Sequence, residues 1–224
     1  MKTLSFHPRL GKFDVTTPVL ICMCIEERKT FWRFNQYCYD AFPDHLAYCS
    51  YEDDQKEDKG ISDVSLYIEN PFHLDLNTKQ NLNALYKLLK KEYFDEIRAS
   101  VDEIEKILIR ICGEIRLDFE AELTMEDSIK VDDVFKLGNL RFSEEDDTML
   151  KRLLKFVLIN YELRGIALVF INRLHDWLDE DEIAQLCSDA GYRGISIVTI
   201  ESHEPKKYLD SEQKIVVDSD LCLL

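Results

Sequence analysis

The chain has 224 residues, 46% of them hydrophobic, which is enough to form a globular domain with a sizeable core. Its 44 acidic and 28 basic residues give a formal net charge of -16, which repels polyanions at long range and argues, on composition alone, against nucleic acid as a partner. No apolar run approaches the roughly 18 residues needed to cross a bilayer, so we expect no membrane-spanning segment.

The cysteines and histidines form no recognisable site. Seven cysteines show no framework spacing and the chain starts without a charged-then-apolar leader, so we expect a reducing, cytoplasmic location. Cys22 and Cys24 point the same way on one expected strand but have no paired Cys or His spacing beside them, so we interpret them as core residues. The five histidines are scattered and G-x-S-x-G does not occur, which argues against a hydrolytic triad.

The first third of the chain predicts a sheet with one helix. The continuous apolar run at residues 19–25 is typical of a buried central strand. Residues 26–42 then carry apolar side chains at helical spacing, and Pro43 ends this first helix. Other strands are expected at residues 1–6, 13–15 and 64–68.

The middle of the chain predicts one long helix, because neither Gly nor Pro occurs between Pro71 and Gly113. A helix over residues 78–117 would be roughly 60 Å long at 1.5 Å per residue, so we expect it to project as a leg. We expect its apolar seam to be covered by a helix at residues 149–163 and by another copy of the chain. The seam repeats at 4-3-4-3-4 spacing and consists of Ile97, Val101, Ile104, Leu108, Ile111 and Ile115.

The last third predicts two strands, at residues 166–171 and 195–200, on either side of a helix opened by Asp179 and Glu182, and one more strand at residues 214–217. Such a βαβ unit has parallel strands. The predicted fold class is therefore α/β, with a mostly parallel sheet and a helical leg. We expect the head to comprise residues 1–75 and 165–224 and the leg residues 76–164.

A phosphate-binding loop is missing from the position where this fold class would place one. The first strand is followed by Glu26-Glu27-Arg28-Lys29-Thr30, whose carboxylates repel phosphate. Neither G-x-x-x-x-G-K-[ST] nor G-x-G-x-x-G occurs in the chain. We therefore do not expect ATP or GTP to be used.

An acidic junction, where the long helix should end, is the strongest local signal. Carboxylates at a helix end and its loop can supply the roughly six to eight oxygens that calcium takes. The alternative is a solvated acidic face, since no EF-hand pattern is present. The junction contains Glu114, Asp118, Glu120 and Glu122, then Glu126, Asp127, Asp132 and Asp133.

Basic residues are few but grouped on the expected helices. Each group can form one cationic helix face, and the alternative is that these residues only solvate their helices. The groups are Arg28, Lys29 and Arg33, then Lys87, Lys90 and Lys91, and finally Lys151, Arg152 and Lys155.

Three motifs, spread in order along the chain, carry a family resemblance. They are Phe34-Asn35-Gln36-Tyr37-Cys38-Tyr39, Leu117-Asp118-Phe119-Glu120, and Leu168-Val169-Phe170-Ile171-Asn172 with the following helix at Leu178-x-x-Asp181-Glu182 and the strand from Ile195 to Ser202. In these the chain resembles the ring-forming, DNA-end-binding adaptation proteins of type II-A CRISPR-Cas systems, which act in spacer acquisition.

The resemblance implies an α/β head with a nucleotide-binding topology that has lost its P-loop, and legs that pair subunits into a homotetrameric ring. It implies that the ring threads double-stranded DNA ends through a basic hole without sequence specificity, is stabilised by calcium, and acts beside other adaptation proteins and the effector nuclease without catalysis. An acidic exterior is compatible with this, because phosphate contacts and cations dominate at close range.

Carried over by position, the calcium ligands are Glu114, Asp118, Glu120 and Glu122, with Asp132 or Asp133 on the following helix. We expect the channel to be lined by Arg28, Lys29 and Arg33, and second by Lys87, Lys90 and Lys91.

Two alternative functions stay open. The carboxylates can form a two-metal nuclease site, with ions about 3.5–4 Å apart, although these residues end a helix rather than strands. The heptad seam can serve a purely protein-binding oligomeric scaffold, which predicts an oligomer without affinity for DNA.

Overall fold

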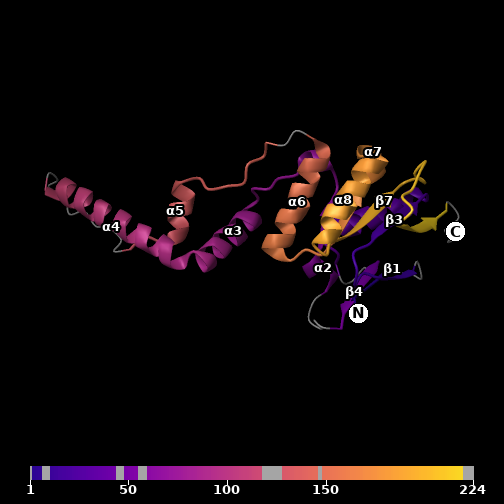
Figure 1. The fold of residues 1–224 in the computed structure, drawn as a ribbon, viewed down its shortest axis with the longest axis horizontal. Helices are drawn as coiled ribbons and strands as arrows, with labels where there is room; N and C mark the ends of the chain where they lie inside the picture. The colour runs from indigo at the N-terminus through magenta and orange to yellow at the C-terminus, as the bar shows by residue number, and fades with distance from the viewer. Residues whose placement is uncertain are drawn as a thin grey trace. The chain divides into compact units, whose positions relative to one another are not determined.

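The computed structural model describes residues 2–6, 11–43, 48–54, 60–117, 128–145 and 148–218 (Figure 1). The chain divides into two compact units, which we call the α/β unit and the helical unit. The α/β unit spans Met1–Asp75 and Glu144–Leu224, and the helical unit spans Leu76–Ser143.

A five-stranded parallel sheet forms the centre of the α/β unit. Its strand order is β5 (Ser65–Ile68), β6 (Leu168–Asn172), β7 (Ser196–Glu201), β3 (Leu20–Ile25) and β8 (Glu212–Val217). Every residue of β3 is buried, as the unbroken apolar run predicts for a strand covered on both faces. The predicted α/β class with a parallel sheet and a helical portion is confirmed.

A small antiparallel sheet accompanies it, in the order β2 (Gly11–Asp14), β1 (Lys2–Phe6) and β4 (Cys49–Asp53). Phe6 of β1 packs on Phe34, with ring centroids 6.3 Å apart. The hydroxyl of Tyr37 donates a hydrogen bond of 3.1 Å to the carbonyl oxygen of Cys49. These contacts join the small sheet to the helix that carries Phe34 and Tyr37.

Helices cover the two faces of the parallel sheet separately. Residues alternate along β7, so that Val198 belongs to the core cluster under α1 (Arg28–Tyr39) and Ile197 to the cluster under α6 (Met149–Arg164) and α8 (Glu180–Tyr192). The short helices α7 (Leu174–Trp177), α2 (Ile61–Val64) and η1 (Pro71–His73) complete the unit.

The position of α6 differs from the one expected from the sequence. Leu153 and Val157 of α6 are fully buried in the same core cluster as Val169 and Ile171 of β6. Because the sheet and α8 take up the apolar side of α6, residues 144–164 belong to the α/β unit rather than to the leg of residues 76–164 that we expected.

The helical unit contains α3 (Lys79–Glu92), α4 (Phe94–Leu117) and α5 (Val131–Leu137). The single helix expected over residues 78–117 is interrupted at Tyr93, which has φ −121° and ψ 35°. Tyr93 still donates to Leu89 and accepts from Ile97, so the interruption leaves both of its backbone groups hydrogen-bonded. None of the helices that the structure describes is long and apolar enough to span a membrane.

Candidate functional site

The N-terminus of α1, which follows β3, is capped by the carboxylate of Glu27. Glu27 caps α1 by accepting hydrogen bonds from the backbone N–H groups of Lys29, at 3.0 Å, and Thr30, at 2.7 Å. These two hydrogen bonds lower the pKa of Glu27. Amides at a helix N-terminus are the groups that would otherwise bind a phosphate. The side chain of Glu27 therefore already binds two of the amides that could otherwise bind a phosphate.

One side of α1 is exposed, basic and aromatic, and we call it the α1 basic face. It comprises Arg28, Lys29, Trp32 and Arg33, of which Trp32 is 63% exposed. Arg28 lies one turn before Trp32, and Lys29 one turn before Arg33. The sequence pattern alone did not identify Trp32, although it falls on the side of the helix opposite the buried residues Phe34, Tyr37 and Cys38.

The second predicted basic group lies on α3. It consists of Lys87, Lys90 and Lys91, whose side chains lie at the surface of the helical unit. The Nζ atom of Lys90 lies 3.5 Å from Oδ1 of Asp132, which is one of the predicted calcium ligands. Since both side chains are about half exposed, at 46% and 48%, this ion pair is worth at most about 1 kcal/mol and a stronger ligand can replace either partner.

The predicted calcium ligands are only partly described. Asp118, Glu120 and Glu122 lie outside the described residues, as do Glu126 and Asp127. Asp132 and Asp133 are neighbours in the first turn of α5, and Oδ1 of Asp133 forms an ion pair of 3.0 Å with Lys136. Asp132 pairs with Lys90 and Asp133 with Lys136, so in the described part of the chain these two carboxylates are neighbours in sequence that contact different lysines.

Glu114 is placed elsewhere on the helical unit. The start of α5 is anchored near Glu105 of α4, whose Oε1 accepts a hydrogen bond of 2.7 Å from the N–H of Ile129. Glu114 lies nine residues further along α4, or about 14 Å at 1.5 Å per residue. Its exposed carboxylate is therefore separate from the first turn of α5 in a single chain.

The heptad seam of α4 has a covered half and an exposed half. Val101 is fully buried and Ile97 and Ile104 are partly buried, in the region where α5 packs. Beyond them an apolar stripe, which we call the distal α4 face, is 39–49% exposed. No described residue of the helical unit covers this face. It consists of Ile107, Leu108, Ile111 and Ile115.

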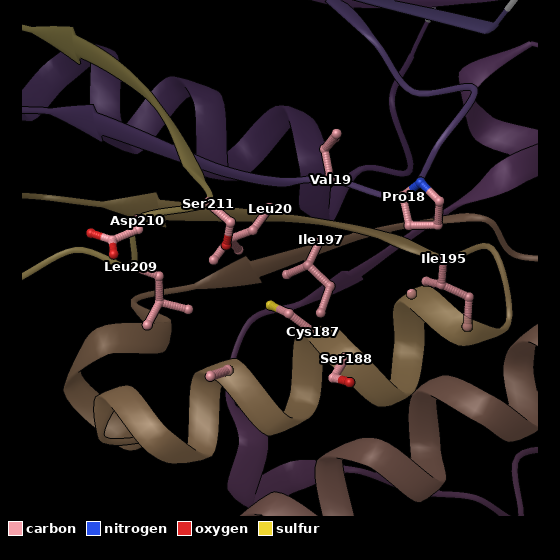
Figure 2. A pocket seen from close by; sticks show the side chains of 12 residues that line it. Pro18, Val19, Leu20, Cys187, Ser188, Ile195, Ile197, Leu209, Asp210 and Ser211 are labelled. Atoms are coloured by element: carbon pink, nitrogen blue, oxygen red, sulfur yellow. The ribbon is translucent and has the colours of Figure 1, made fainter.

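A pocket of about 490 Å³ lies between α8 and the strands. Figure 2 shows Cys187 of α8 facing Leu20 of β3 and Ile197 of β7. These residues stand at the amino ends of their strands, whereas ligands of open α/β sheets bind at the carboxyl ends. We therefore assign this pocket no ligand.

Comparison with known proteins adds an independent finding. The family described as "CRISPR-associated protein (Cas_Csn2)" matches residues 44–221, well over half of the chain. No curated protein matches the chain. The matched range includes the acidic junction and four of the five strands of the parallel sheet, and it confirms the resemblance carried by the sequence motifs. The chain therefore belongs to the Cas_Csn2 family of CRISPR-associated proteins, the adaptation proteins of type II-A systems.

Proposed function

We propose that the chain is a non-catalytic, cytoplasmic subunit of spacer acquisition that assembles into a calcium-stabilised homotetrameric ring and binds double-stranded DNA ends without sequence specificity. Membership of the family supports a role in CRISPR adaptation. The proposed protein partners are the other adaptation proteins and the effector nuclease. The proposal for DNA rests on the α1 basic face.

The α1 basic face is a local exception in a chain of net charge -16. Among the described residues, none forms an ion pair with Arg28, Lys29 or Arg33, so these cations are available to phosphates. Lysine and arginine contacts to phosphate oxygens bind DNA without reading its sequence and weaken as salt rises. Trp32 adds an exposed ring that can stack on the unpaired bases of a frayed end.

The distal α4 face supports self-assembly. In this exposed stripe Leu108, Ile111 and Ile115 follow the heptad seam and Ile107 adjoins it; such a stripe is unfavourable in water and suits pairing with the same stripe of another copy. Pairing of this stripe with itself joins two copies, and a second interface between two such pairs would complete the proposed tetrameric ring.

Calcium would act at the acidic junction. Asp132 and Asp133 offer exposed oxygens whose lysine partners are held weakly enough for a divalent ion to replace them. Two carboxylates do not satisfy calcium, so we propose that Asp118, Glu120 and Glu122 supply further oxygens. Glu114, which lies further along α4, would serve the same ion from another copy or a second ion.

A gel shift comparing linear with closed circular duplex, with calcium or with chelator, tests the proposal on protein whose mass is known from light scattering. Calcium-dependent retention of linear DNA by a tetramer is expected. The triple variant Arg28→Ala/Lys29→Ala/Arg33→Ala should lose most of this retention. A matched control, Lys12→Ala/Lys206→Ala/Lys207→Ala, removes three positive charges elsewhere on the surface and should retain it.

The alternative functions give different outcomes. An oligomer without DNA retention at any calcium concentration would leave a protein-binding scaffold, for which the distal α4 face is sufficient. Magnesium-dependent cleavage of plain duplex would instead indicate a nuclease at the acidic junction.

A further inference from the structure

A charged cluster lies buried on the face of the parallel sheet that α8 covers. His175 of α7 places Nδ1 3.0 Å from Oε1 of Glu201, at the end of β7, and Nε2 3.3 Å from Oε1 of Glu212, at the start of β8. The side chains of His175, Glu201 and Glu212 are 11%, 2% and 0% exposed. Burying two carboxylates is costly unless cations or hydrogen bonds compensate for the lost hydration.

Glu201 holds His175 in one orientation. Its Oε1 atom accepts a hydrogen bond from the backbone N–H of His175 at 3.2 Å, and another from the hydroxyl of Thr199. With these contacts Glu201 remains a carboxylate, because burial raises its pKa but the hydrogen bonds from His175 and Thr199 outweigh burial and lower it. A carboxylate facing Nδ1 assigns the proton to that nitrogen and leaves Nε2 to face Glu212.

Glu212 has one satisfied and one unsatisfied oxygen. Oε2 accepts a hydrogen bond of 3.0 Å from the N–H of Leu209, which fixes the carboxylate. Oε1 is buried and accepts no hydrogen bond of acceptable geometry, although Nε2 of His175 is its neighbour. The Sγ atom of Cys22, on β3, completes a group in which one atom each of Cys22, His175 and Glu212 lie within 4.8 Å of one another.

We propose that Cys22, His175 and Glu212 bind a divalent transition-metal ion, with zinc the best fit, and that Glu201 orients the histidine as its outer carboxylate. Zinc bonds of about 2.0–2.2 Å at tetrahedral angles separate a nitrogen and an oxygen ligand by about 3.4 Å. The observed separation of Nε2 and Oε1 is 3.3 Å. A histidine that binds metal through one nitrogen and donates to a carboxylate through the other is the usual arrangement of such sites.

A pocket borders two residues of the cluster, His175 and Glu201. It has a volume of about 400 Å³ and is also lined by His203 and Lys206. A water molecule from this pocket can complete four-coordination, as at zinc sites with three protein ligands. The nitrogen and sulfur ligands distinguish this site from the all-oxygen acidic junction, which suits calcium.

A nucleophilic triad and a metal-free ion pair both fit the cluster less well. A Cys-His-Glu triad needs an accessible thiolate, whereas Cys22 is 1% exposed and burial, with Glu212 and Glu201 adding to it, raises the pKa of its thiol. An imidazolium between two carboxylates leaves Oε1 of Glu212 without a well-directed hydrogen-bond donor. A divalent ion can replace two protons, the one on Nε2 of His175 and the one on the Cys22 thiol, so the charge of the cluster is unchanged while Oε1 of Glu212 gains a bond to the ion.

Titration of the dialysed full chain with Co²⁺, a spectroscopic substitute for zinc, tests the site. Calcium is kept in excess so that exposed carboxylates are occupied. Visible absorption bands of tetrahedral Co²⁺ should saturate at one ion per chain, and Zn²⁺ should displace them. His175→Gln and Glu212→Gln should abolish the bands, and Glu201→Gln should weaken affinity about 10- to 100-fold.

His203→Gln is the matched control, since it removes a second histidine of the same pocket and should leave the bands unchanged. Cys22→Ser tests the sulfur ligand separately from the histidine and glutamate ligands, because it should remove any sulfur-to-cobalt band in the near ultraviolet. Unaltered Co²⁺ affinity in His175→Gln, or no tetrahedral bands with the wild-type chain, overturns the proposal. If a substitution of one of these buried residues prevents folding, the Co²⁺ spectrum of the wild-type chain alone decides whether the site binds metal.

Discussion

Lys90 and Asp132 form an ion pair, with 3.5 Å between Nζ and Oδ1, so a predicted DNA-binding residue is held by a predicted calcium ligand. A calcium ion on Asp132 would remove that partner from Lys90. The proposed effects of calcium and of DNA are therefore linked at this pair, in addition to any effect of calcium on assembly.

Asp132→Asn should release Lys90 without calcium. We expect DNA retention in chelator to increase about two- to fivefold, in proportion to an exposed ion pair worth up to about 1 kcal/mol. Quantitative gel shifts at fixed salt measure the change. Glu103→Gln, which removes one exposed negative charge from α4, is the control. An equal gain in both variants would show that only net charge matters.

Leu108→Glu/Ile111→Glu should break the assembly without unfolding the chain. Both side chains are 39–42% exposed, so charging them costs little in the single chain but opposes burial of the distal α4 face against another copy. Light scattering should show a lower mass with an unchanged circular dichroism spectrum. Ile109→Glu is the control for the position of the added charge on α4, because Ile109 is 55% exposed and lies outside the distal α4 face. A tetramer that survives the double substitution would exclude this face as the interface.

Unfolding free energy should fall at alkaline pH in metal-free protein. Burial lowers the pKa of His175, but the neighbouring carboxylates of Glu201 and Glu212 outweigh burial and raise it from 6.5 to about 9. The stabilisation is complete below the unfolded value of 6.5 and is lost as pH rises through about 9, with a change on the order of 3 kcal/mol. Urea unfolding in chelator between these pH values measures it. His175→Gln should flatten the profile, and a profile that stays equally steep would assign the loss to other groups.

Leu153→Ala tests the position of α6. Because Leu153 is fully buried beneath the sheet, the substitution should lower the unfolding free energy by about 2–5 kcal/mol. Leu140→Ala in the helical unit, where the side chain is 40% exposed, should change it much less. Chemical unfolding compares the two, and similar small effects would contradict the packing of α6.

The strands and the first helix could be predicted because local pattern determines them. An unbroken run such as residues 20–25 suits only a strand covered on both faces, and Pro43 limits the helix before it. The position of α6 could not be predicted, since its apolar side suits a sheet as well as a coiled-coil seam. The interruption at Tyr93 could not be predicted either, because no Gly or Pro lies near it in the sequence.

The proposed metal site was beyond sequence reasoning for a different reason. Cys22, His175 and Glu212 share no local spacing, and they meet only because parallel strands bring distant segments onto one face of the sheet. The basic residues of α1 were found from composition, but the exposure of Trp32 depends on which side of the helix the core takes.

The carboxylate of Glu27 at the start of α1 bears on whether binding of a partner can be driven by nucleotide hydrolysis. Proteins that bind a nucleotide at the corresponding helix N-terminus can couple its hydrolysis to the binding and release of a partner. Because hydrolysis is irreversible, the cycle then runs in one direction. Because the carboxylate of Glu27 already binds amides of this helix N-terminus, we expect no nucleotide hydrolysis at this position. Binding and release of DNA by the proposed ring would then stay close to equilibrium. The concentrations of free DNA ends, calcium and protein partners would determine whether binding or release prevails.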